Sequence, residues 1–147
     1  GIVLKHERGE WSGPAFFNIG AGSVGLQLGG QTVDLILVIL GQRTMDSFLK
    51  TKFKLGGDIA VAAGPVGAQA TAATEIFLRG GIYSYSRTQG AFIGLSIEGA
   101  GIMTQEEMNK AYYNASFSPA DILSGQVPLP ESAIQLINTL NKVKSAE

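Results

Sequence analysis

The chain has 147 residues, of which 45% are hydrophobic and 16% are charged, and its formal net charge is −1. This length and apolar content suit one folded domain, whereas the near-neutral charge excludes a global basic field that would attract nucleic acid. The absence of cysteine excludes disulfides and thiol chemistry. The longest apolar run, residues 33–40, is far shorter than the ~20 residues of a membrane-spanning helix.

The first residues are expected to form strands, because residues 1–11 alternate like a strand that runs into a turn at Gly9-Glu10, and residues 9–19 supply the next one. The chain begins inside this first predicted element, with no basic leader segment or lipid-attachment cysteine before it. We therefore expect a mature, cut or truncated product, with an upstream segment that includes any targeting signal missing.

The stretch NIGAGSVG, residues 18–25, contains a literal G-x-G-x-x-G, and Asp46 follows at about the distance expected for a dinucleotide-binding motif. That motif requires a helix to begin at its third glycine. A second glycine pair at 29–30 falls where this helix would need its middle turns, and residues 20–28 alternate instead like a strand. No nucleotide cofactor is therefore expected, and the strand is predicted to bury Val24, Leu26 and Leu28.

Two elements follow this segment: an apolar strand in residues 33–40 and a short amphipathic helix in residues 41–51. The helix is predicted because Met45, Phe48 and Leu49 fall at i, i+3 and i+4. The chain then returns to period two before a turn at Gly64-Pro65. One face of this strand is predicted to carry Leu55, Gly57, Ile59, Val61 and Ala63.

Residues 80–99 are predicted as a hairpin, because the polar break from Arg87 to Gly90 separates two apolar strands. Pairing these two residues sets Tyr85 opposite Phe92. Aromatic pairs in register across a hairpin contribute ~0.2–1 kcal/mol each and help to fix the register.

The last third of the chain is predicted to be helical. Residues 104–107 have the spacing of a capping box, and Ser118-Pro119-Ala-Asp121 is typical of the start of a short second helix. Two apolar stripes at helical spacing indicate the buried faces of the first and last helices. These are Met108, Ala111, Tyr112 and Ala115 in the first, and Ala133, Leu136, Ile137, Leu140 and Val143 in the last, which ends in Lys142 and Lys144.

Six or more short strands with glycine-rich turns, one interposed short helix and C-terminal helices predict an α+β fold. Its core is expected to be a curved antiparallel sheet or to be barrel-like. Residues 1–147 are predicted to form a single domain.

Catalytic and metal-binding constellations are scarce. His6 is the only histidine, and its charged neighbours indicate a solvent-facing strand end. Asp34 lies in an apolar run, so its carboxylate must reach solvent or be hydrogen-bonded, and a structural hydrogen bond is favoured over general-base chemistry. We expect no enzyme activity and no metal.

Several phrases follow one another in the order and spacing of SYLF domains: GEWSGP, IGAGSVGLQLGGQTVDLILVIL, KLGGDIAVAAGPVG, IYSYSRTQGAFIGLSIEG and ILSGQVPLP. The chain resembles this family nearly throughout. The resemblance places the GAGSVG glycines in the β-rich core of a lipid-binding domain. It also implies a non-enzymatic role, since eukaryotic SYLF proteins bind phosphoinositide membranes and actin, whereas bacterial members are commonly exported, often as lipoproteins.

A stand-alone bacterial member, periplasmic or attached to the outer membrane as a lipoprotein, is favoured over a eukaryotic peripheral membrane protein. The front part of the family domain, which carries membrane and actin contacts, is expected to be absent. The main functional hypothesis is binding to anionic, phosphoinositide-like lipid head groups. The alternative is a structural or protein-interaction module, with actin as partner in a eukaryote or a cell-envelope component in a bacterium.

The predicted lipid-binding residues alternate in the segment LKTKFK. If this segment is extended, its lysines project from one face and form a cationic stripe that attracts phosphates. An exposed edge strand protected by lysines against aggregation explains the same pattern without a ligand. The proposed phosphate contacts are Lys50, Lys52, Lys54 and Arg87.

Overall fold

The computed structural model describes residues 1–20, 34–50, 52–57, 59–65, 81–88, 91–94 and 99–145. The chain divides into two compact units: residues 1–18 with 104–147 form unit 1, and residues 19–103 form unit 2. Strands and helices occur together, and most strand pairs are antiparallel, which confirms the predicted α+β class. The strands of the described residues form open sheets rather than a closed barrel.

The strands of unit 1 lie near the N-terminus. β1 (Ile2–Val3) pairs antiparallel with β4 (Ala15–Gly20), which continues into unit 2. β2 (His6–Glu7) and β3 (Glu10–Trp11) form a hairpin. Its turn is at Arg8-Gly9, one residue earlier than predicted. Arg8 and Gly9 have positive φ angles of 53° and 80°, and a two-residue turn that matches the twist of a hairpin requires positive φ at both positions.

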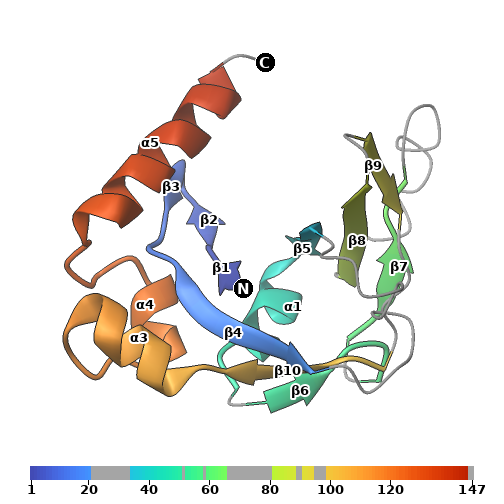
Figure 1. Cartoon of the computed structure of the whole chain (residues 1–147), viewed down its shortest axis with the longest axis horizontal. Coiled ribbons are helices and arrows are strands. Elements are labelled where there is room, and N and C mark those ends of the chain that lie inside the picture. The colour runs from blue at the N-terminus through green and yellow to red at the C-terminus, as the bar shows by residue number, and fades with distance from the viewer. Residues whose placement is uncertain are drawn as a thin grey trace. The chain divides into compact units, whose positions relative to one another are not determined.

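Three helices complete unit 1, and Figure 1 shows them in orange to red at the C-terminal end of the chain. They are α3 (Glu106–Tyr113), α4 (Pro119–Leu123) and α5 (Glu131–Ser145). The predicted start of α4 is confirmed, because Ser118 and Asp121 form a reciprocal capping box. The capping box predicted at residues 104–107 is wrong: Thr104 ends β10 (Gly101–Thr104), and Gln105 caps α3 without a side-chain hydrogen bond.

The buried face of α3 differs from the predicted stripe. The helix buries Asn109 and Tyr113, whereas Met108 is 48% exposed. The reason is polar: the Asn109 Oδ1 accepts a hydrogen bond from the Phe16 amide at 2.7 Å, and the Tyr113 hydroxyl donates one to the Pro14 carbonyl at 2.6 Å. These two bonds fix which side of the helix faces β4 and the residues before it.

The apolar stripe of α5 is present as predicted but is covered unevenly. Ala133 is fully buried, the residues in the middle of the stripe are half-buried, and Val143 near the C-terminus is 63% exposed. The half-buried residues are Leu136, Ile137 and Leu140.

The main sheet of unit 2 is built around one long strand. β8 (Gly81–Thr88) pairs antiparallel with β5 (Asp34–Leu40), and the whole of β5 takes part in this pairing. Figure 1 shows β7, β8 and β9 side by side. β7 (Val61–Ala63) pairs parallel with the first half of β8, and β9 (Ala91–Gly94) pairs antiparallel with the second half.

The predicted hairpin exists, but its register is wrong by two residues. Thr88 pairs with Ala91, so Tyr85 lies opposite Gly94 and Phe92 lies opposite Arg87. Continuing the ladder to residues 88 and 91 leaves only two residues in the connection, the shortest loop that a hairpin commonly uses. The expected pairing of Tyr85 with Phe92 is therefore lost.

The short helix of unit 2, α1 (Gln42–Ser47), confirms the predicted interposed helix. Met45 and Phe48 are buried, and the Phe48 ring packs edge-on against Phe53 with centroids 4.6 Å apart. Leu49, the third residue of the predicted stripe, lies beyond the helix end and is 40% exposed.

β6 (Lys52–Lys54) pairs antiparallel with β10 and ends sooner than predicted. Gly56 has a φ of 84°, and its amide donates to the Ile59 carbonyl at 2.8 Å, so the chain turns where a continuous strand was expected. Three members of the predicted face, Leu55, Ile59 and Val61, are buried, whereas Ala63 is exposed. The glycine-rich strand predicted for residues 20–28 lies outside the described residues except for Gly20, which ends β4.

Candidate functional site

Two of the predicted lipid-binding residues share one face of β6. Lys52 and Lys54 are exposed, and Phe53 between them is buried at 4% exposure, so the expected alternation is present. Lys50 is also exposed, but it lies in a bend before the strand and does not belong to the stripe. The cationic stripe within β6 therefore consists of two lysines.

The neighbouring strand extends this face with an apolar side chain. Met103 of β10 pairs with Lys52 and is 48% exposed, and Gly101 pairs with Lys54. We call Lys52, Lys54 and Met103 the β6–β10 face. It presents two ammonium groups beside a thioether, a combination that suits contact with a head-group region.

Arg87 lies elsewhere in unit 2, on β8 of the main sheet. It is exposed and pairs in register with Asp34, the first residue of β5, which is exposed as well. Opposite charges across two strands stabilise the sheet modestly. Asp34 reaches solvent at the start of β5, which is one of the two outcomes expected for a carboxylate in an apolar run.

The motifs AAGP and YSYS meet at the end of β7. A Cβ added to Gly64 would lie 2.1 Å from the Tyr85 Cζ, so the ring lies directly over the glycine backbone. The Tyr85 hydroxyl donates to the Pro65 carbonyl at 3.0 Å, and the Ser84 hydroxyl donates to the Ala62 carbonyl at 3.4 Å. These motifs therefore serve packing, a role for Gly64 that the sequence analysis missed.

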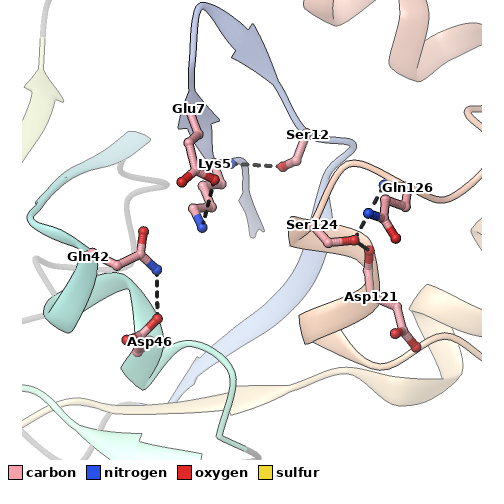
Figure 2. A network of polar contacts seen from close by, with 8 residues as sticks. All are labelled: Lys5, Glu7, Ser12, Gln42, Asp46, Asp121, Ser124 and Gln126. Atoms are coloured by element: carbon pink, nitrogen blue, oxygen red, sulfur yellow. Dashed lines mark hydrogen bonds and ion pairs between the residues drawn. The ribbon is translucent and has the colours of Figure 1, made fainter.

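The β2–β3 hairpin of unit 1 borders a hollow of about 300 Å³ that the sequence analysis did not anticipate. Its walls are the hairpin residues Lys5 to Ser12, apart from His6 and Gly9, and the end of α4 at Leu123–Gly125. Figure 2 shows the Lys5 side chain reaching Glu7 on the hairpin. It also shows Ser124, the C-cap of α4, whose hydroxyl donates to the Asp121 carbonyl. We call this feature the hairpin hollow.

His6 lies outside the hollow and is exposed on β2, as predicted. Its ring stacks on Trp11 with centroids 4.6 Å apart. Among the described residues, no group of three histidine, aspartate or glutamate side chains is placed to hold a metal ion. None of the helices in the described part of the chain is both long and apolar enough to span a bilayer.

Comparison with known families identifies the chain. Residues 20–143 match the model of the Ysc84 family, whose description is Las17-binding protein actin regulator. The chain belongs to this family. The match confirms the predicted resemblance to SYLF domains, because the Ysc84 domain is the SYLF domain.

Three relatives show how much of a Ysc84 protein the chain represents. It is 32% identical over 143 residues to an SH3 domain-containing protein of Schizosaccharomyces pombe, 31% identical over 142 residues to protein YSC84 of Saccharomyces cerevisiae, and 32% identical over 143 residues to SH3 domain-containing YSC84-like protein 1 of Rattus norvegicus. These matches cover 95–96% of the chain but only 33%, 30% and 42% of the respective relatives. The chain thus spans less than half of each relative.

All three relatives are eukaryotic, so the expected bacterial origin and envelope location gain no support from them. Their names describe a domain content or a family, and another yeast relative, 30% identical over 142 residues, is named LAS seventeen-binding protein 3. No solved structure matches the chain.

Proposed function

We propose that this Ysc84 domain is a non-enzymatic protein-interaction domain that acts in actin regulation, with actin filaments as its partner. The match of residues 20–143 to a family of Las17-binding actin regulators carries the proposal. The names of the relatives also describe binding proteins and not enzymes. This corresponds to the alternative, and not to the main hypothesis, of the sequence analysis.

The site chemistry supports a binding role. His6 is exposed on β2, and its ring lies against Trp11 with the centroids 4.6 Å apart. The polar and aromatic groups of the family motifs, such as Tyr85 over Gly64, are engaged in packing. What the described surface offers is exposed charge and exposed apolar area, the means by which proteins bind other proteins.

Co-sedimentation with actin filaments tests this proposal. The purified chain should pellet with filaments in a saturable manner and stay in solution without them. Immobilised Las17 serves as a second bait, because a chain that ignores actin but binds Las17 would act through the other partner named in the family description. A chain that binds neither bait at tens of micromolar contradicts the proposal.

A second function is favoured by the β6–β10 face. We propose that Lys52 and Lys54 contact anionic lipid head groups, with Lys50 adding charge from the preceding bend. Each basic residue near an anionic surface contributes ~1 kcal/mol. The exposed Met103 beside them adds apolar area that a purely charged patch lacks.

Vesicle co-sedimentation tests the lipid proposal. The triple change Lys50→Glu, Lys52→Glu and Lys54→Glu should reduce association with phosphoinositide vesicles sharply, and the effect should shrink with salt because the Debye length is about 8 Å at 0.15 M. Lys142→Glu, an exposed lysine on α5, is the matched control. Arg87→Glu should have a smaller effect, since Arg87 lies in a different sheet. Wild-type protein that ignores these vesicles at low salt rules the lipid function out.

A further inference from the structure

The three methionines of the chain differ in their access to solvent. Met45 of α1 is buried at 7% exposure, whereas Met103 of β10 and Met108 of α3 are each 48% exposed. The chain contains no cysteine, so its thioethers are the side chains that a peroxide oxidises most readily. Oxidation is therefore expected at the two exposed methionines and not at the buried one.

The strand that carries Met103 is anchored from its other face. Ile102, the preceding residue of β10, is 1% exposed and pairs with Phe53 of β6, which is 4% exposed. Successive side chains of a strand point to opposite faces, so these two residues hold β10 and β6 to the core while Met103 stands on the exposed face. A change at the Met103 sulfur can therefore alter the β6–β10 face without opening the core beneath it.

The cross-strand partner of Met103 is a lysine. Met103 lies directly opposite Lys52 in the antiparallel register of β10 and β6, and residues in such a pair project to the same side with Cβ atoms about 4.5–5.5 Å apart (Figure 1). In the described part of the chain, the Lys52 ammonium forms neither an ion pair nor a hydrogen bond. The thioether opposite is only a weak acceptor, so it leaves this ammonium group available to a phosphate.

Oxidation of Met103 changes both properties that the β6–β10 face offers to a head group. Hydrogen peroxide transfers one oxygen atom to the Met103 Sδ: its O–O bond breaks, an S=O bond forms, and the peroxide leaves as water. The sulfur is thereby oxidised by two electrons and the peroxide is reduced by two. The product is polar, and its oxygen accepts hydrogen bonds from an ammonium group, which the lysine opposite is long enough to supply.

We propose that Met103 is an oxidation site through which peroxide weakens the association of the β6–β10 face with anionic lipid. In the sulfoxide form the apolar contact of Met103 is lost, and the sulfoxide oxygen holds the Lys52 ammonium on the protein. The inference rests on the lipid function proposed for this face and adds a covalent modification that controls it. Methionine sulfoxide reductases reverse the modification.

Met108 provides a control within the same chain, because it has the same exposure but different neighbours. Residues three and four positions apart are neighbours on a helix surface, and for Met108 the next ones along α3 are Ala111 and Tyr112, neither of which is a cation. Met108 also lies in unit 1, outside the β6–β10 face. Oxidation of Met108 should therefore leave vesicle binding unchanged.

The experiment treats the folded chain with hydrogen peroxide and measures its binding to vesicles of phosphatidylcholine and a phosphoinositide. Two glutamates lie between Met103 and Met108, so cleavage after glutamate separates them and mass spectrometry reports the oxidation of each. The treated chain should carry sulfoxide at both positions and an unmodified Met45. Its affinity for the vesicles should fall about fivefold, as expected for the loss of one lysine contact. Reductase treatment should restore it.

Four variants separate Met103 from general damage by peroxide. Binding by Met103→Leu should not change on treatment, because leucine is apolar and has no sulfur to oxidise, whereas Met108→Leu should keep the full sensitivity. Met103→Gln, whose amide oxygen imitates the sulfoxide, should weaken binding without peroxide, and Met108→Gln should not. Circular dichroism shows whether each protein is folded.

Three results would overturn the inference: no sulfoxide at Met103 under conditions that oxidise Met108, unchanged binding by a chain that carries Met103 sulfoxide, or an equal loss of binding when Met103→Leu is treated. In each of these cases the untreated chain still binds, so the lipid function stands. An untreated chain that ignores the vesicles would refute the lipid function itself and this inference with it, and the untreated sample alone identifies that outcome.

Discussion

Two polar side chains decide how the first C-terminal helix of this domain is attached. Asn109 and Tyr113 are i and i+4 on α3, and each bonds a backbone group of the N-terminal strand region, at Phe16 and Pro14. Gly13 makes room for this arrangement, since a Cβ there would lie 2.8 Å from Leu129 and closer still to the Tyr113 hydroxyl. A segment from each end of the chain is thereby joined within unit 1.

Tyr113→Phe should lower the free energy of unfolding by about 1–3 kcal/mol, because the Pro14 carbonyl would remain buried without its donor. Urea unfolding followed by circular dichroism measures this change. Tyr112→Phe is the matched control, since the Tyr112 hydroxyl bonds only the exposed Ser132 hydroxyl in the described structure. Equal losses in the free energy of unfolding for the two substitutions would show that the buried hydrogen bond of Tyr113 stabilises the domain no more than the exposed one of Tyr112.

Tyr113 also predicts a dependence of stability on pH. Burial raises the pKa of this phenol above its ordinary value of 10.0, and the neighbouring Tyr112 raises it further. The unfolded chain ionises from about pH 10, whereas the folded chain keeps its proton, so stability is complete below pH 10 and falls as the pH rises above it. Tyr113→Phe should flatten this decline in urea midpoints measured from pH 8 to 11. A decline of the same slope in the variant would assign it to other groups, such as Tyr83, whose pKa is also raised by burial.

At the scale of elements, short sequence patterns predicted the helices whose signals lie within or next to the helix itself. They failed where contacts with residues distant in the sequence determine which face is buried. The capping residues of α4 and the stripe of α5 lie within their own helices, and both helices were found from sequence. The buried face of α3 depends on partners 93 and 99 residues away, so the apolar pattern chose the wrong side. The break after β6 depends on the positive φ of Gly56, which period-two counting does not see.

The packing of β7 against β8 gives a prediction at this scale. Gly64→Ala should destabilise the domain by about 1–3 kcal/mol, because the new methyl group would overlap the Tyr85 ring and force it to move. Tyr85→Ala should be costly alone, since a half-buried ring and its bond to Pro65 are lost.

The double variant separates the two causes. With the ring removed, the three atoms nearest to the added methyl group are gone, so Gly64→Ala should cost less in the Tyr85→Ala background than in the wild type. Urea midpoints of the four proteins measure this coupling. Strictly additive effects would contradict this explanation, because they would show that the close approach of the Tyr85 ring is not what requires glycine at position 64.

The candidate sites, too, could be predicted from the sequence only where their residues are neighbours in the chain. The alternating lysines could be recognised because their spacing is visible within five consecutive residues, 50–54. Lys50 lies outside the stripe because β6 begins only at Lys52. The hairpin hollow was not found, because its two walls come from residues near 10 and near 124, more than a hundred positions apart. A close pair of glutamates flanking a two-residue turn was the only trace of it in the sequence.

At the scale of the whole molecule, we propose that residues 1–147 fold as one domain although they form two compact units. β4 passes from unit 1 to unit 2 within a single strand, and β10 passes back, so unfolding of either unit disrupts a strand of the other. Urea unfolding should therefore give one transition, with coincident midpoints for Trp11 fluorescence, which reports on unit 1, and far-ultraviolet circular dichroism, which reports on both. Two separated midpoints would show two independent folding units.

The central claim is that this Ysc84 domain binds a partner of the actin system without catalysing a reaction. Co-sedimentation of the purified chain with actin filaments, across a range of filament concentrations, tests it most directly. The folded chain should pellet in a saturable manner and only with filaments, and a chain unfolded in advance should not. A chain that remains in the supernatant at every filament concentration, while retaining its folded spectrum, would contradict it.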